Sequence, residues 1–386
     1  MKNWHPAHAN MLYVAYKMLV NSPQKLFGML ISATFSSFII MQQPSIYQGV
    51  SERLIAPIKA IPTADLWVMG ARSETPDQPT HFDPIDSYRI RSVPGVLWAT
   101  QLYRAWMWMK HKSSEKTLNW DVTGVDSYTL LGLPQDMTQK DKEAIRYPNA
   151  VIVDGYALNQ FTKNNPLKLK DKLIEGPRTY IVRAVSKPLR TYSVNPRLYM
   201  LSTHLPTEYA QNSFILVKVK PHYKVLAVAQ AIHARTNYDA LTPQQFMDRT
   251  LNFFSKSTPI IIMFVAVGVG GFLIGLIIMW QIFSNFILTH LHQFGMLKML
   301  GVPNSMLKQM VLFQAALIGG VAYLLSVVLI TVFEKIFVNT DVACHFTFTI
   351  ALFGLIGTFA MVFLASFFSL LKVLRLDSVE LCRDQN

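Results

Sequence analysis

The chain has 386 residues, of which 51% are hydrophobic and 15% are charged, and its formal net charge is +13. An average soluble protein has roughly 25% charged residues. Four stretches contain no Asp, Glu, Lys or Arg: residues 26–50, 257–289, 309–333 and 342–371. Because a bilayer about 30 Å thick requires roughly 20 apolar residues of a helix, this pattern excludes a purely soluble protein.

The N-terminal segment, residues 1–25, is expected to form an amphipathic helix in the cytoplasmic membrane interface. Its apolar side chains share one helical face, formed by Met11, Val14, Ala15, Met18 and Leu19. The alternative is a cytosolic extension of the first membrane span. Pro23 interrupts the pattern and favours the separate helix.

Four membrane-spanning helices are expected: residues 26–43, 259–283, 310–332 and 346–370. No small-residue cleavage site closes the first span, so we interpret it as an uncleaved signal anchor. The spans carry no charged side chain, which argues against a proton relay within the membrane.

The orientation follows from Lys and Arg in the short loops, because such residues remain in the cytoplasm. They cluster in three segments: residues 1–25, 284–309 and 371–386. The short loop 333–345 contains only Lys335. We therefore expect both termini and the segment 284–309 in the cytoplasm, and the large segment 44–258 outside it.

The external segment has the pattern of a folded α+β domain. Short runs with alternating apolar residues predict strands at residues 64–69, 102–109, 150–153, 180–185, 199–202 and 213–219. Capping residues and helical spacing predict helices at residues 83–91, 154–162 and 225–235. The expected fold class is an α-helical membrane protein with four spans and a large α+β domain, or two small ones, inserted between the first two spans.

One predicted strand, residues 102–110, alternates in a way that points to a recognition surface. Arg104, Trp106, Trp108 and Lys110 share one face of it, and Met and Ala residues occupy the other. This basic aromatic face would suit an adaptor protein or an amphiphilic anion. The alternative, which we favour from sequence alone, is a packing layer between sheet and helix.

Small residues in the first two spans are spaced for close helix packing: Gly28, Ser32 and Ser36, with Gly271 and Gly275. They fit either a dimer interface or packing within one four-helix unit. The sequence does not separate the two.

The sequence contains no nucleotide-binding P-loop, zinc protease signature or nucleophile elbow. His290 and His292 are two residues apart, a spacing that places them on different helical faces, so we interpret them as structural or interfacial. Cys344 and His345 lack a third ligand in the sequence. We expect a non-catalytic subunit with no metal or cofactor of its own.

The segment 284–309 follows the second span directly and contains a short amphipathic helix. Phe294, Leu297 and Leu300 have helical spacing, and Gly301 and Pro303 end the helix. The apolar side of such a helix requires a partner protein, or else the membrane surface.

The arrangement of one span, a large external domain and three spans resembles the MacB/FtsX-type (type VII) permeases of ABC systems. In that family the loop after the second span reads approximately Arg-Glu-Ile-Gly-x-x-Lys-Ala-x-Gly. The aligned residues here are His292, Gln293, Phe294, Gly295, Met296, Leu297, Lys298, Met299 and Gly301. Gly295, Lys298 and Gly301 match the pattern, whereas Gln293 replaces the acidic residue.

Within the family the chain is most similar to the DevC-like branch. The strings that carry this resemblance are FGMLISATFSSFIIMQQ, ADLWVMGARSE and STPIIIMFVAVGVGGFLIGLIIMWQIFSNFILTHLHQFGMLKMLG. IRSVPGV, NWDVTGVD, AVIVDG and LTPQQFMDRT resemble phrases of the MacB-type periplasmic domain.

The resemblance implies an inner-membrane exporter subunit. Two permease copies would pair with two cytosolic P-loop ATPase subunits, which bind ATP and Mg and grip the aligned residues of the segment 284–309. ATP-driven closure would then move the periplasmic domains, a mechanism called mechanotransmission. DevC-like members resemble parts of tripartite assemblies with a periplasmic adaptor and an outer-membrane duct, so the expected cargo is amphiphilic or lipid-like.

Two alternatives remain open from the sequence. An FtsX-like scaffold would control a periplasmic cell-wall hydrolase and transport nothing. A LolC/LolE-like permease would extract lipoproteins together with a second, related permease. A membrane enzyme is the weakest alternative, since no catalytic constellation is visible.

The location of the excess positive charge indicates which classes of partner the chain could bind. The external segment 44–258 contains 27 basic and 18 acidic residues, so most of the excess charge lies outside the cytoplasm. This location excludes a nucleic-acid partner and suits anionic lipids, acidic cargo or the acidic surface of an adaptor.

Overall fold

The computed structural model describes residues 5–374 except 84, 112–116, 136, 160–166, 338–339 and 341. Contacts divide the chain into two compact units: Met1–Val50 with Pro259–Asn386, and Ser51–Thr258. We call them the membrane unit and the external unit. Most of the cytoplasmic tail expected at 371–386 lies outside the described residues.

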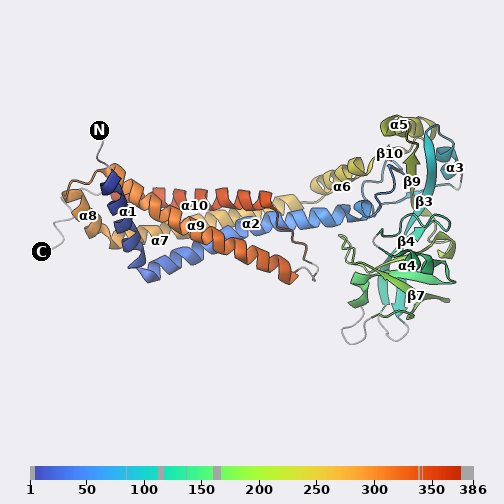
Figure 1. Cartoon of the computed structure of the whole chain (residues 1–386), viewed down its shortest axis with the longest axis horizontal. Helices are drawn as coiled ribbons and strands as arrows, with labels where there is room; N and C mark the ends of the chain where they lie inside the picture. Colours follow the sequence, from blue (N-terminus) through green and yellow to red (C-terminus); the bar gives the residue numbers. More distant parts are fainter. Residues whose placement is uncertain are drawn as a thin grey trace. The chain divides into compact units, whose positions relative to one another are not determined.

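The membrane unit is a helical bundle (Figure 1). Its helices are α1 (His5–Val20), α2 (Pro23–Lys59), α7 (Ile260–Thr289), α8 (Leu291–Met299), α9 (Asn304–Phe337) and α10 (Phe348–Leu374). Four of them, α2, α7, α9 and α10, are long and apolar enough to cross a membrane. This confirms the expectation of four spans.

Helix α2 is longer than the sequence suggested. The first span was expected to end at residue 43, before Pro44, but the helix runs to Lys59 and contributes its last residues to the external unit. A proline removes one backbone donor and does not always end a helix. The hydroxyl of Ser45 donates to the carbonyl of Met41 at 2.7 Å and supplies one local hydrogen bond at this point.

The small residues of the first two spans serve packing within the chain. A Cβ atom added at Gly275 would lie 2.2 Å from the Ser36 hydroxyl oxygen, and one at Gly271 would lie 2.5 Å from Ile39. Such distances allow α2 and α7 to touch only where glycine is present. Gly28 and Ser32 line an apolar groove between the same two helices.

Helix α1 packs against α9, so its apolar face has a protein partner. Ala15, Met18 and Leu19 are buried in the core of the membrane unit, whereas Val14 is 37% exposed. The side-chain amide of Gln314 donates to the carbonyl of Ala15 at 2.8 Å. The face predicted for the membrane interface is therefore largely covered by the chain's own bundle.

The external unit is built on a mixed sheet of ten strands: β1 (Leu66–Met69), β2 (Thr80–His81), β3 (Val96–His111), β4 (Thr117–Val125), β5 (Ala150–Asp154), β6 (Lys172–Glu175), β7 (Arg178–Ser186), β8 (Arg197–Leu201), β9 (Asn212–Val219) and β10 (Asp239–Leu241). The order is β10-β1-β9-β3-β4-β8-β5-β7-β6, with β2 paired to β9. The pairs β4–β8 and β5–β7 are parallel.

Strand β3 belongs to both halves of this sheet. Up to Tyr103 it pairs with β9, and from Tyr103 onward it pairs with β4. Strand β6 returns to β3 at Lys110 and His111, so six strands close on themselves. We call β3–β4–β8–β5–β7–β6 the barrel half and the remainder the open half.

Helices cover the faces of the sheet. Helices α3 (Asp86–Arg91) and α5 (Val225–Thr236) cover one face of the open half, and α6 (Pro243–Ser257) covers the other together with the end of α2. The barrel half encloses its own core, which includes Met107, Trp120 and Leu198. Short helices α4 (Gln139–Glu143), η1 (Ala144–Arg146), η2 (Gly155–Asn159) and η3 (Ser202–His204) complete the unit. The expected α+β class is confirmed.

Replacing Gly275 by Ala should separate α2 from α7, because the new methyl group collides with Ser36. We expect a loss of about 1–3 kcal/mol in stability, measured as a lower thermal midpoint in detergent. Gly270→Ala on the same helix is the matched control, since nothing lies within 4 Å of an added Cβ there. Equal midpoints for the two variants would contradict the close approach.

Candidate functional site

The short helix α8 ends at a glycine. Leu300 is its C-cap, and Gly301 follows with φ +83°, a left-handed conformation that glycine adopts without strain. The amide of Gly301 donates to the carbonyl of Lys298 and that of Val302 to the carbonyl of Leu297, both at 3.1 Å. This pair of bonds is a Schellman motif, which satisfies the last carbonyls of the helix.

The side chains of α8 divide into an inner and an outer group. Phe294 is 3% exposed and joins the core of the membrane unit, where Leu297 packs against that core from its edge. The exposed group is His292, Gln293, Met296, Lys298, Met299 and Leu300. Met299 is 70% and Leu300 is 81% exposed. Of the residues predicted to contact an ATPase, Phe294 therefore anchors the helix, and the exposed ones form its outer surface.

Two side-chain contacts tie the junction between α7 and α8 to the start of α2. The hydroxyl of Ser22 lies 3.2 Å from Nε2 of His290, and the ammonium group of Lys25 donates to the hydroxyl of Thr289. Nδ1 of His290 lies 2.8 Å from the carbonyl oxygen of Phe286, which can only accept. The hydrogen is therefore on Nδ1, and in the neutral ring Nε2 accepts from Ser22. This assignment gives His290 the structural role expected from sequence.

The contact between His290 and Ser22 should appear as an energetic coupling. Because each side chain needs the other as its hydrogen-bond partner, we expect His290→Ala and Ser22→Ala to be non-additive, with a coupling of about 1 kcal/mol in a double-mutant cycle. The measurement is the free energy of unfolding in detergent micelles. Thr331→Ala, which removes a hydroxyl that donates to the carbonyl of Val328 within α9, should combine additively with His290→Ala. Additive losses for the Ser22 pair would exclude the contact.

Strand β3 presents two exposed tryptophans. Trp106 is 38% and Trp108 is 63% exposed, and Lys110 is exposed beside them. On the opposite face Met107 and Met109 are fully buried. No helix of the described structure covers the tryptophans, so the packing layer favoured from sequence is not formed within this unit.

Arg104 does not belong to that exposed face, which corrects the sequence expectation. It is 5% exposed and forms ion pairs with Asp121 at 3.0 Å and Asp77 at 3.1 Å. Arg197 pairs with the same Asp121 through Nε at 2.9 Å and through a second, shorter contact. The alternation of β3 identified the correct face of the strand, but the loop carrying Asp77 covers that face at residue 104.

Burial would raise the pKa of Asp121, but Arg104 and Arg197 hold it below its usual value. The carboxylate therefore stays charged between two guanidinium groups. A buried pair of this kind is costly to break from one side, because the remaining charge has no partner. The cluster joins β3, β4 and β8 to the loop between β1 and β2.

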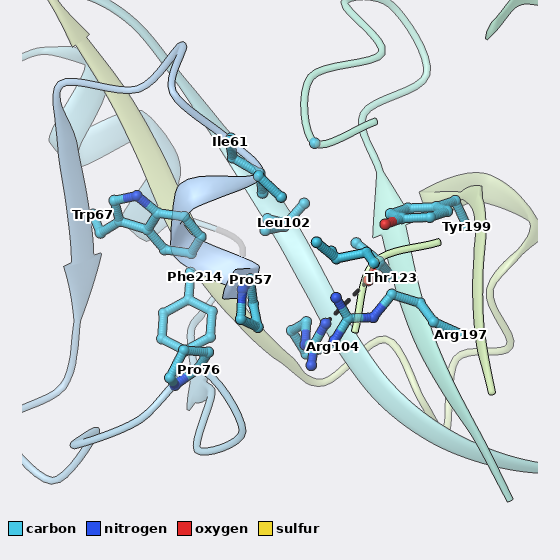
Figure 2. Close-up of a pocket in the computed structure, with 13 residues that line it drawn as sticks. Pro57, Ile61, Trp67, Pro76, Leu102, Arg104, Thr123, Arg197, Tyr199 and Phe214 are labelled. Atoms are coloured by element: carbon cyan, nitrogen blue, oxygen red, sulfur yellow. Dashed lines mark hydrogen bonds between the residues drawn. The ribbon is translucent and has the colours of Figure 1, made fainter. Parts of the chain in front are cut away.

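A small cavity lies beside this cluster (Figure 2). Arg104 and Arg197 border it together with Tyr199, and Trp67 and Phe214 of the open half lie near its other side. Its volume is about 20 Å³, which is enough for roughly one water molecule. The cavity is therefore too small to hold a ligand of substrate size.

Asp154 is the second buried carboxylate of the barrel half, with 1% exposure. Burial raises its pKa to about 6, although the amides of Tyr156 and Leu189 donate to it at 2.7 and 2.8 Å. Sequence reasoning missed Asp121, Asp154 and Arg197. The available signal was a charged residue beside a run of β-forming apolar residues.

The raised pKa of Asp154 predicts a pH dependence. The folded state binds a proton below about pH 6 and the unfolded state only near pH 4, so this group favours folding at low pH. Its contribution is lost as the pH rises from about 4 through 6. Asp154→Asn should remove this fall, measured as the thermal midpoint in detergent against pH. Parallel pH profiles of variant and unaltered chain would contradict the assignment.

The described residues contain no cluster of three His, Cys, Asp or Glu side chains that could hold a metal ion. His345 contacts Glu334 at 3.5 Å. Burial raises the pKa of the neighbouring Cys344 thiol to about 11, with a further rise from Glu334. This thiol is protonated at neutral pH and is a poor nucleophile.

Comparison with known proteins matches residues 257–378 to the family described as FtsX-like permease C-terminal. The periplasmic region of MacB from Actinobacillus actinomycetemcomitans aligns with 13% identity and a TM-score of 0.35, over 50% of this chain and 95% of that one. The extracellular domain of the ABC-type transporter YknZ from Gram-positive bacteria aligns with 16% identity and a TM-score of 0.32, over 46% and 99%. No curated protein matches in sequence.

Proposed function

We propose that this chain, whose residues 257–378 match the FtsX-like permease C-terminal family, is a permease of the MacB/FtsX type. It would couple ATP hydrolysis by a separate cytosolic ATPase to motion of its external unit. The chain itself would be a non-catalytic membrane subunit. ATP and Mg would be bound by the ATPase.

The proposal rests mainly on the structure of α8, which has one buried side and one exposed apolar side. It is a short helix between two membrane spans, anchored by Phe294, with the exposed apolar residues Met296, Met299 and Leu300 on its outer side. Lys298 adds a positive charge to this surface. An exposed apolar group next to a charge suits a protein partner on the cytoplasmic side.

Contacts at the N-terminal end of α2 suggest how movement would pass from α8 to the external unit. Because Ser22 and Lys25 bond to His290 and Thr289, where α7 ends and α8 begins, a displacement of α8 would reach the start of α2 through these contacts. Helix α2 then continues without interruption to Lys59 in the external unit. Two permease copies and two ATPase subunits would make the complete complex, with both termini in the cytoplasm of a bacterial inner membrane and the external unit in the periplasm.

We further propose export of an amphiphilic or lipid-like cargo, as in the DevC-like branch, within an assembly that includes a periplasmic adaptor and an outer-membrane duct. Trp106, Trp108 and Lys110 support this part, because exposed tryptophan beside lysine suits an adaptor or an anionic amphiphile.

The test is co-purification of the chain with a P-loop ATPase. Met296→Asp combined with Lys298→Glu should reduce the bound ATPase by about tenfold or more, since both side chains lie on the outer surface of α8. Tyr128→Asp in the external unit, where the side chain is 90% exposed, is the matched control and should leave the complex intact.

Unchanged ATPase binding after residues 294–299 are scrambled would disprove the coupling assignment. If a cell-wall hydrolase co-purified instead of an adaptor, the result would support a regulatory scaffold and contradict the assignment as an exporter. A second, related permease in the complex would indicate lipoprotein extraction.

A further inference from the structure

The loop between β7 and β8, residues 187–196, supplies a hydrogen bond that α2 lacks. Pro57 has no N–H group, so the carbonyl of Arg53, four residues earlier, loses its helical donor. The amide of Tyr192 donates to that carbonyl at 3.2 Å. A proline near the end of α2 therefore creates a binding point for this loop.

The same residue contacts a second helix. The ring of Tyr192 packs edge-on against Phe254 of α6, with ring centroids 5.2 Å apart and an angle of 64°. Helix α2 leads into the external unit and α6 leads out of it, immediately before α7. Tyr192 thus touches both segments that connect the external unit to membrane helices.

The other end of the loop is fixed to the barrel half. The amide of Leu189 donates to the buried carboxylate of Asp154, at the end of β5, at 2.8 Å. The guanidinium group of Arg190 lies over the ring of Tyr156, 5.2 Å from its centroid. Leu189 and Arg190, which contact the barrel half, therefore lie within three positions of Tyr192, which contacts the two helices.

We propose that residues 189–192 form a strap that transmits displacement of α2 and α6 to the barrel half, with Tyr192 as its positioning residue. This inference rests on the proposed function, because it requires an ATP-driven movement of α2. Apolar contacts also join these helices to the barrel half, through Ile58, Phe246 and Tyr199. Those contacts are non-directional, whereas the bonds at Arg53 and Asp154 fix the loop in one place.

The experiment is hydrogen–deuterium exchange on the full chain in complex with its co-purified ATPase, with and without ATP and vanadate. In the unaltered complex we expect nucleotide to change exchange in both residues 51–59 and residues 178–186. Tyr192→Ala should keep the change in residues 51–59 and lose most of that in residues 178–186. Without nucleotide, exchange of the amide at position 192 should rise about fivefold, as expected for loss of an aromatic pair.

Two further variants distinguish loss of the strap contacts from a nonspecific loss of structure in the loop. Tyr192→Phe keeps the ring and the amide and should behave as the unaltered chain. Pro57→Ala restores a helical donor for the Arg53 carbonyl, which competes with the Tyr192 amide, and should reproduce the loss in residues 178–186 without removing any loop side chain.

The outcomes are distinguishable. A nucleotide response in residues 178–186 that survives both Tyr192→Ala and Pro57→Ala overturns the strap and leaves the proposed function standing. A response absent from both segments of the unaltered complex overturns the proposed function and the strap with it. A loss in Tyr192→Phe equal to that in Tyr192→Ala also overturns the strap, because ring packing would then not be the cause.

Discussion

The continuity of α2 is the constraint on which the rest of the structure depends. After Pro23 at its first position, this helix contains Pro44 and Pro57, and each of these two leaves a carbonyl group of the preceding turn without its helical donor. Backbone carbonyls in folded proteins generally have a hydrogen-bond partner, and at Pro57 the amide of Tyr192 in the β7–β8 loop donates to the carbonyl of Arg53. At 1.5 Å per residue, 37 residues span about 55 Å, well beyond a bilayer. The helix is therefore long enough to contribute residues to both units.

Much of the fold follows from hydrophobic patterning. The four spans and most strands were predictable, because their apolar residues recur with the period of a helix or a strand. The extension of α2 was not, because Pro44 and Pro57 indicate helix ends unless other groups satisfy the backbone. Strand β4 was missed as well. Asn119, Asp121 and Gly124 have low strand propensity, and only the arginines of β3 and β8 make Asp121 acceptable there.

Only part of the candidate site around α8 was predictable from the sequence. Gly301 and Pro303 indicated the end of α8 correctly, because the left-handed turn requires a residue without Cβ. Packing against distant helices decides which side chains of α8 face the bundle. The inward position of Phe294 could therefore not be predicted from the sequence. For the same reason the alternation of β3 did not reveal that a loop carrying Asp77 covers Arg104. Local periodicity predicts which residues share one face of a helix or strand. Only tertiary contacts determine which other part of the chain covers that face.

The pairing of β1 with β10 has a consequence for biogenesis. Trp67 lies opposite Leu241, so the sheet brings together residues from the two ends of the external unit. A pairing so distant in sequence cannot form until residue 241 has been synthesised and exported. The sheet is complete only after residue 241 has been translocated, when α7 is the next segment to enter the membrane. Insertion of α2 and export of the intervening chain must therefore precede folding, and a nascent chain stalled before β10 would leave one edge of β1 unpaired.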